Sequence, residues 1–361
     1  MNKVKEIKLV CLLPYSEDTV PGQRFRWEQW KTYLPYKKII IKNIYLLNPT
    51  YSYIESKSKF LSIIYFTYLY FVFFFKILIN YNYDNFVIFR NCTLVGPPII
   101  EFFLKVFNKK IIFDFDDAIY LGSENNDNWF IKNFIRCDWK IKFIIKISTA
   151  VICGNDLLKF YSKKYNSNSF VVPTTIDLKK YKSDKYINYK KKYLTVGWSG
   201  SYSTSRYIEK LLPDLFKLQK KIYFKIILIG TNLQFNNHYI DCIPWNSKKE
   251  IQDLLKIDIG LMPLPNNQWT RGKCGLKILQ YLSLNIPSIA SNVGINSKII
   301  KNNFNGFLIK SRHEWSKVLY KLITNKKLFF YTKKNCRSTI KKNYTSSVAC
   351  NVLNYKLRKI L

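Results

Sequence analysis

The stretch from Trp269 to Ser291, WTRGKCGLKILQYLSLNIPSIAS, decides the fold of this chain. Leucines recur at helical spacing and form one face: Leu276, Leu279 and Leu282. Asn285 and Pro287 then end the predicted helix, because proline cannot continue it. Residues 287–290 follow as a run of small and apolar side chains, which is typical of a strand inside a parallel sheet. The stretch therefore predicts a glycine-containing loop, a short helix and a buried strand.

Cations gather at the start of that predicted helix. Arg271, Lys273 and Lys277 stand there, and Gln280 comes one turn later. Cations reinforce the free backbone N–H groups of a first helical turn, so the expected guest is an anion such as a diphosphate. The alternative is a solvated basic helix end in a chain that contains 59 Lys and Arg residues.

This stretch resembles the nucleotide-binding core of the family-4 (group 1) retaining glycosyltransferases, which have the two-domain fold called GT-B. The Gly-Leu pair at 275–276 and the strand entry at 285–288 match the family motif. Gly272 and Gln280 stand where the motif has its two glutamates, and Lys277 stands in place of a proline. The run is similar to a subgroup with Gly-Lys-Cys-Gly, then Lys, then Gln-Tyr.

The resemblance implies an α/β fold of two doubly wound, Rossmann-like domains that face each other across a cleft. It implies retaining transfer of a sugar from a nucleotide-sugar donor to a hydroxyl of a glycan or lipid-linked acceptor, in bacterial surface polysaccharide or glycolipid synthesis. It further implies no metal and no cofactor, since the nucleotide sugar is a substrate. Loss of both motif glutamates favours the alternative of a catalytically silent protein that binds a sugar nucleotide or an assembly partner.

Alternation of strands and helices runs twice along the chain and by itself supports two doubly wound domains. Between the two runs lies a Lys- and Tyr-rich stretch without apolar periodicity. We predict an acceptor-side domain at 1–178, a linker at 179–192 and a nucleotide-sugar-binding domain at 193–340. A final helix at 341–361 is expected to return to the first domain, as the resemblance implies.

Two places in the first half carry candidate acceptor-side residues. A Pro-Gly loop follows the predicted strand at 7–13, where the backbone of an α/β unit approaches ligands; an ordinary turn is the alternative. A second predicted strand begins at Phe86 and ends in an arginine. The candidates are Gly22, Arg24, Arg26 and Arg90.

A carboxylate cluster follows the predicted strand at 110–115. Ligands of open α/β sheets lie at the carboxyl ends of strands, so Asp116 and Asp117 are candidate catalytic residues. They could accept hydrogen bonds from sugar hydroxyls, or one could act as a base; loop capping is the alternative. Asp114 still lies within the strand, so we expect it to point into the domain and not to complete an Asp-x-Asp metal site.

The second half opens with a predicted strand at 193–198 and a Ser/Gly/Thr loop at 199–205, which can cradle phosphate. The donor-binding candidates in this loop are Gly200, Ser201 and Thr204. Relatives usually place cations here, but this chain has Trp198, so the charges are expected from the segment 271–277. Trp245 lies in the region where relatives hold the nucleotide base.

A net charge of +36 leaves three classes of partner open: nucleic acid, an anionic membrane or an anionic substrate. No zinc-finger spacing, basic zipper or RNA-binding signature is present, so nucleic acid is not expected. The eight cysteines are scattered without a CxxC pair, which fits reduced thiols in a cytoplasm. Neither of the two histidines, His238 and His313, lies in a metal-ligand cluster.

The run from Phe60 to Phe75 contains no charged residue and many aromatic ones. It is shorter than the about 20 residues that span a bilayer. It could pack on its domain, also touch an anionic membrane, or span one. The first apolar run of the chain breaks at Pro14 and does not read as a signal peptide. We therefore expect a cytoplasmic protein that could also make peripheral contact with the inner face of the plasma membrane.

Overall fold

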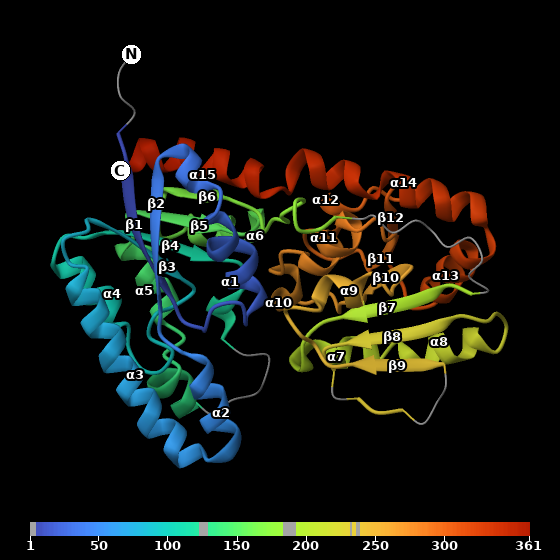
Figure 1. Ribbon diagram of the computed structural model, residues 1–361, viewed down its shortest axis with the longest axis horizontal. Coiled ribbons are helices and arrows are strands. Elements are labelled where there is room, and N and C mark those ends of the chain that lie inside the picture. Colours follow the sequence, from blue (N-terminus) through green and yellow to red (C-terminus); the bar gives the residue numbers. More distant parts are fainter. Residues whose placement is uncertain (1–4, 123–128, 183–192, 232, 236–238) are drawn as a thin grey trace. The chain divides into compact units, whose positions relative to one another are not determined.

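The computed structural model describes residues 5–122, 129–182, 193–231, 233–235 and 239–361 (Figure 1). Contacts divide the chain into two compact units. The first contains residues 1–174, Gly272–Cys274 and Ser346–Leu361, and the second contains Thr175–Arg271 and Gly275–Thr345. The boundaries drawn from the sequence stay a prediction, because contacts do not test independent folding. Most of the linker expected at 179–192 lies outside the described residues.

The first unit is built on one parallel sheet of order β2-β1-β3-β4-β5-β6. Its strands are β1 (Ile7–Leu13), β2 (Ile39–Tyr45), β3 (Asn85–Phe89), β4 (Lys110–Phe115), β5 (Ala150–Cys153) and β6 (Ser169–Val171). Continuous apolar runs make the central strands, because both faces of the sheet are covered. The order reverses between β1 and β3, and doubly wound sheets bind ligands beyond the carboxyl ends of strands at such a point.

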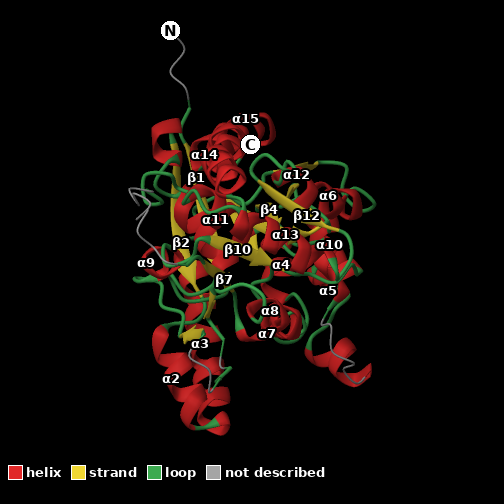
Figure 2. Cartoon of the chain, turned by 90° about the vertical axis from the view of Figure 1, so that its right-hand side faces the viewer, coloured by secondary structure: helices red, strands yellow, loops and turns green. Residues whose placement is uncertain are grey.

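Helices flank the strands of this sheet (Figure 2). They are α1 (Pro21–Gln23), α2 (Pro49–Lys57), α3 (Lys59–Ile79), α4 (Ile99–Val106), α5 (Lys140–Ile147), α6 (Asp156–Ser162) and α15 (Ser346–Ile360). Shorter turns of helix lie at Arg24–Glu28, Leu34–Lys37, Ile119–Leu121 and Ile131–Ile135. The last helix of the chain, α15, contributes Ala349, Leu353 and Leu357 to the same buried core as β1 and β5.

The segment that follows β1 is helical from Pro21 to Trp30, with a π-helical turn at Arg24–Glu28, and it ends in a 3-10 turn at Leu34–Lys37. Pro35 and the left-handed backbone of Lys38 end the segment, and the next strand starts at once.

The second unit repeats the plan with the parallel order β12-β11-β10-β7-β8-β9. Its strands are β7 (Thr195–Ser199), β8 (Lys225–Ile229), β9 (Ile240–Ile243), β10 (Ile259–Met262), β11 (Ser288–Ser291) and β12 (Gly306–Ile309). Its helices are α7 (Tyr202–Glu209), α8 (Leu212–Gln219), α9 (Glu250–Leu254), α10 (Gln268–Arg271), α11 (Leu276–Ser283), α12 (Asn296–Ile299), α13 (Glu314–Thr324) and α14 (Lys326–Asn343). Here the order reverses between β7 and β10, so the loops after these strands mark the expected ligand edge.

Candidate functional site

In the first unit, the candidate residues meet at the ligand edge, where β3 and β4 end. Arg90 follows β3 and joins both carboxylates that follow β4. Its Nε donates to Asp116 Oδ1 at 2.8 Å and its Nη2 donates to Asp117 Oδ2 at 2.8 Å. One guanidinium therefore fixes the orientation of two carboxylates, which share its charge-assisted hydrogen bonds.

The backbone of Arg90 is itself unusual. It has a φ of 59°, in the left-handed region that side chains with a Cβ rarely adopt, and its N–H donates to the Asp114 carbonyl at 2.7 Å. Burial lowers the pKa of Arg90, but the charges of Asp116 and Asp117 more than offset this, so the pKa is raised above its ordinary value. The arrangement keeps a permanent cation between two carboxylates at the ligand edge, a place where backbone strain is often stored.

Gly22 packs directly against this cluster. A Cβ at this position would overlap the Asp116 carboxylate and the Arg90 guanidinium. The neighbouring candidate, Arg24, is held on its own loop by Asp18, with its Nε donating to Oδ1 at 2.6 Å. Of the acceptor-side candidates, Gly22 and Arg90 therefore contact the two carboxylates, whereas Arg24 pairs with Asp18.

Arg26 was predicted on the acceptor side, but the structure places it in the core. Its side chain has no exposed surface and forms two hydrogen bonds with the Asp114 carboxylate, from Nε at 2.9 Å and from Nη2 at 2.6 Å. Its Nη1 donates to the Val172 carbonyl at 2.8 Å, and its guanidinium lies over the Trp30 ring. A side chain so enclosed is not available to an acceptor, so this part of the prediction is wrong. The inward orientation predicted for Asp114 is confirmed.

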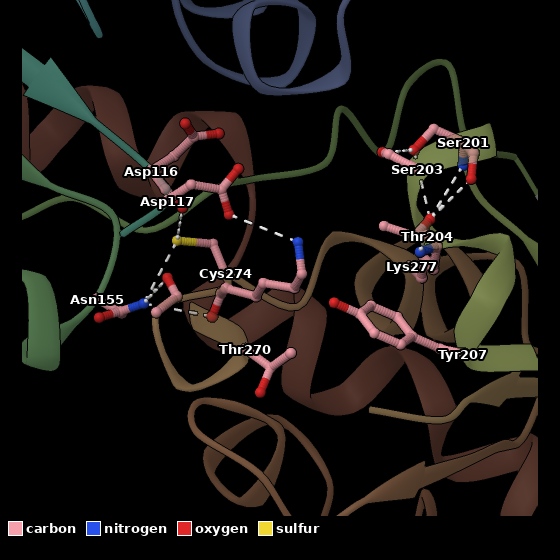
Figure 3. Close-up of polar contacts among 12 residues, drawn as sticks. Asp116, Asp117, Asn155, Ser201, Ser203, Thr204, Tyr207, Thr270, Cys274 and Lys277 are labelled. Carbon is pink, nitrogen blue, oxygen red and sulfur yellow. Dashed lines mark hydrogen bonds and ion pairs between the residues drawn. The ribbon is translucent and has the colours of Figure 1, made fainter. Parts of the chain in front are cut away.

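The segment Gly272–Cys274 belongs by its contacts to the first unit and lies beside the carboxylates (Figure 3). The Cys274 thiol donates to the Asp116 carbonyl at 2.9 Å, and Asn155 Nδ2 donates to the Gly272 carbonyl at 2.7 Å. Lys273 Nζ lies 4.0 Å from Asp117 Oδ1. A Cβ on Gly272 would lie 2.6 Å from the Cβ of Ala118, so this packing leaves no room for the motif glutamate.

In the second unit, the loop after β7 forms the other cluster (Figure 3). Lys277 Nζ, from the first turn of α11, donates to Thr204 Oγ1 at 3.4 Å and lies 4.9 Å from the centre of the Trp198 ring. Thr204 Oγ1 also accepts from the Ser201 N–H at 3.2 Å, at the start of α7. Gly200 packs against the Trp198 ring and the Lys277 side chain. A cation, a helix N-terminus and small hydroxyl groups therefore lie together, as phosphate binding requires.

Tyr281 holds this loop in place from α11. Its hydroxyl accepts a hydrogen bond from the Ser199 N–H at 2.8 Å, and its ring packs on Gly260 of β10. Burial raises the pKa of Tyr281, so the phenol stays protonated. The two strands at the reversal of the sheet are thus tied to the helix that carries Lys277.

The three cations predicted to converge have different neighbours. Arg271 ends α10 and donates from Nε to Asn266 Oδ1 at 2.7 Å, on an exposed part of the unit. Lys273 belongs to the first unit, and Lys277 alone joins the loop after β7. The sequence placed all three at one helix start, but α11 begins at Leu276, so only Lys277 lies on that helix.

Gln280 lies at the end of a buried polar chain that sequence reasoning missed. Its Nε2 donates to the Tyr181 hydroxyl at 2.9 Å, and that hydroxyl donates to Glu250 Oε2 at 3.0 Å. The Trp245 indole N–H donates to the other oxygen of Glu250 at 3.1 Å. Two predicted donor-side residues are therefore linked through Tyr181 and Glu250. Only the position of Trp245 in the expected base region hinted at this, since Tyr181 lies 99 residues from Gln280.

No group of three His, Cys, Asp or Glu side chains that could hold a metal ion occurs among the residues that the structure describes. His313 lies beside Ser311, with 3.3 Å between Nε2 and Oγ, and His238 lies outside the described residues.

Comparisons with known proteins agree on the fold. Residues 204–343 match the sequence profile of the family "Glycosyl transferases group 1". A comparison with curated protein sequences gives no match. A glycosyltransferase structure from Rickettsia africae is 14% identical, with 99% of each chain covered and a TM-score of 0.68.

Two further structures have a similar architecture. Sucrose-phosphate synthase from Thermosynechococcus elongatus is 10% identical, with 99% of each chain covered and a TM-score of 0.68. The Anabaena protein HepE in complex with UDP and glucose is 10% identical, with a TM-score of 0.66 over 98% of this chain and 100% of its own. The chain thus has the two-domain GT-B fold of glycosyltransferases, and its segment 204–343 matches group 1 of those enzymes.

Proposed function

We propose that this protein is a retaining, metal-independent glycosyltransferase without a cofactor. It moves a sugar from a nucleotide-sugar donor to a hydroxyl of a glycan or lipid-linked acceptor. The reaction belongs in the cytoplasm and serves the synthesis of a bacterial surface polysaccharide or glycolipid.

The observation that carries this proposal is the cluster of Lys277, Thr204 and Ser201 at the reversal point of the second sheet. Two of the three residues lie within the segment that matches group 1, and Ser201 lies three residues before it. As the bond to the sugar breaks, negative charge grows on the leaving diphosphate. Lys277 and the backbone N–H groups of the first turn of α7 could stabilise that charge without a metal.

The first unit would supply the acceptor side. Arg90 orients Asp116 and Asp117, and the partly exposed Asp117 carboxylate can accept hydrogen bonds from sugar hydroxyls, while the buried Asp116 supports Arg90. Gly22 lets the backbone approach the same carboxylates. These roles would position an acceptor hydroxyl, while the second unit holds the donor.

A donor screen tests the proposal. Purified protein is incubated with UDP-, GDP- and dTDP-sugars, with and without an acceptor mixture, and the released nucleotide is measured. UDP-glucose is included because the Anabaena structure contains UDP and glucose. We expect release with at least one donor, unchanged by EDTA because cations replace a metal. Loss of release in EDTA with recovery in manganese would contradict metal independence.

The alternative is a catalytically silent protein that binds a sugar nucleotide or an assembly partner. It is favoured by Gln280, which replaces a carboxylate and is already paired with Tyr181, and by the absence of space for a glutamate at Gly272. Donor binding measured by calorimetry, without release or transfer for any donor that binds, would support this alternative over the enzyme.

Replacing Asp117 by asparagine is expected to reduce turnover about tenfold, because the amide keeps an acceptor oxygen but loses the charge that strengthens its hydrogen bonds. The melting temperature should change little, since the carboxylate is partly exposed. Asp138→Asn is the matched control: Asp138 also pairs with an arginine, Arg136, and is similarly exposed. A large loss of stability in Asp117→Asn, with turnover per folded molecule unchanged, would assign Asp117 to loop capping.

A further inference from the structure

The outer face of α3 is apolar and exposed. One stripe of this face, at helical spacing, consists of Ile64, Tyr68, Phe71 and Phe75, each more than half exposed. The opposite face packs on the unit through Leu69, Phe73 and Ile77. Among the residues that the structure describes, α3 is the one helix whose length and composition would allow it to cross a membrane, with a mean hydropathy of 1.9.

The apolar surface continues from α3 onto neighbouring elements of the first unit. The rings of Phe74 and Phe103 lie 5.3 Å apart and join α3 to α4, which runs beside it (Figure 1). The Gly96 N–H donates to the Ile135 carbonyl at 2.7 Å and joins the start of α4 to the segment 129–135. Exposed apolar side chains on these two elements are Ile99, Phe102, Val106, Trp129, Phe130 and Phe134.

Positive charges predominate around this surface, although Glu55 stands in the last turn of α2, close to the start of α3. Exposed lysines stand at the two ends of α3 and on α4: Lys57, Lys59, Lys76 and Lys105. The sequence contains no Asp or Glu at 56–83, 102–113 or 129–137. The acid of α4, Glu101, is buried and accepts hydrogen bonds from the Cys92 N–H and the Thr93 hydroxyl. An apolar face with a mainly cationic rim fits an anionic layer that has an apolar interior.

We propose that the exposed surface of α3, α4 and residues 129–135, here called the α3 surface, docks on an anionic phospholipid bilayer. A second copy of the chain would bring two such cationic rims together and add to the repulsion of a net charge of +36 on each. The helix lies in the interface and does not span, because Leu69, Phe73 and Ile77 keep one side of it in the core of the unit. This membrane-docking proposal does not depend on whether the protein transfers a sugar.

Sedimentation with lipid vesicles tests the proposal. The full-length protein is mixed with vesicles of phosphatidylglycerol and phosphatidylcholine, or of phosphatidylcholine alone. We expect binding to the anionic vesicles, with high salt releasing much of it because the charge attraction is screened. The variant F71S/F75S should bind at least about tenfold more weakly, since it removes two aromatic side chains that would enter the interface.

The matched control is Phe160→Ser, because Phe160 is an equally exposed phenylalanine on α6 of the same unit. It should bind anionic vesicles like the parent protein. Three results would overturn the proposal. These are no binding to anionic vesicles, equal binding by F71S/F75S, and retention through both carbonate and high salt, which would show insertion. Dimers in solution that F71S/F75S abolishes would assign the surface to a second copy instead. Release of nucleotide from the sugar donor is measured separately. Vesicle binding can therefore fail while the proposed glycosyl transfer is observed, and glycosyl transfer can fail while the vesicles are bound.

Discussion

Replacing Arg26 by methionine is expected to lower the free energy of unfolding by about 3–5 kcal/mol, the scale for breaking one partner of a buried ion pair. The change leaves Asp114 as a carboxylate with no exposed surface, whose remaining contact in this group is the Trp27 indole N–H at 2.6 Å. Burial lowers the pKa of Arg26, but Asp114 more than reverses this, so the pKa of Arg26 is raised; burial also raises the pKa of Asp114, and Arg26 opposes that rise. Chemical denaturation monitored by tryptophan fluorescence measures the loss.

Arg24→Met is the matched control, two residues away. Arg24 pairs with Asp18, whose side chain is 55% exposed, so its loss should cost less than about 1 kcal/mol. The double variant R26M/D114N should recover part of the stability, because asparagine removes the unpaired charge and still accepts from Trp27. A loss for Arg26→Met no larger than that for Arg24→Met would show that the buried pair is not a stabilising centre of the first unit.

Replacing Lys277 by methionine is expected to weaken binding of a nucleoside diphosphate by about 1.5–3 kcal/mol, the scale for hydrogen bonds to charged groups. That loss corresponds to about 10–150-fold in Kd. The methionine keeps much of the apolar contact with the Trp198 ring but removes the cation that lies 4.9 Å from its centre. Binding of the bare nucleoside should change little, since it carries no phosphate. Calorimetry with the two ligands measures the difference directly.

Lys301→Met provides the control for this experiment. Lys301 is an exposed lysine of the same unit that also lies over an aromatic ring, that of Phe304. Its replacement should leave both affinities unchanged. Equal losses for nucleoside and nucleoside diphosphate in Lys277→Met would mean that the variant distorts the loop after β7, and no loss for either would remove the phosphate role.

The strands were predictable because their signals are local. Short, mostly apolar runs at Ile7–Leu13, Lys110–Phe115 and Ser288–Ser291 favour strands covered on both faces. The inward orientation of Arg26 was not predictable from its own segment. Arg26 pairs with Asp114 across 88 residues and its guanidinium lies over the Trp30 ring, and such a contact leaves no pattern in the local sequence.

The candidate site was predictable only where one loop contains the whole signal. Asp116 and Asp117 follow a strand, and a Ser/Gly/Thr run follows another, so both could be placed at sheet edges. Contacts between residues that are far apart in the sequence leave no such local pattern. The sequence does not say that Arg90 bridges the two carboxylates, that Lys277 lies on Trp198, or that Gln280 meets Tyr181.

The return of α15 to the first unit has a consequence for synthesis on the ribosome. Ala349, Leu353 and Leu357 fill the same core as β1 and β5, yet they are translated only after the whole second unit. At about 5–20 residues per second, the nascent first unit waits many seconds while the whole second unit is made. Until α15 emerges, apolar side chains of the first sheet that it covers stay exposed. Chaperones that bind nascent chains could therefore protect the first unit during this interval of synthesis.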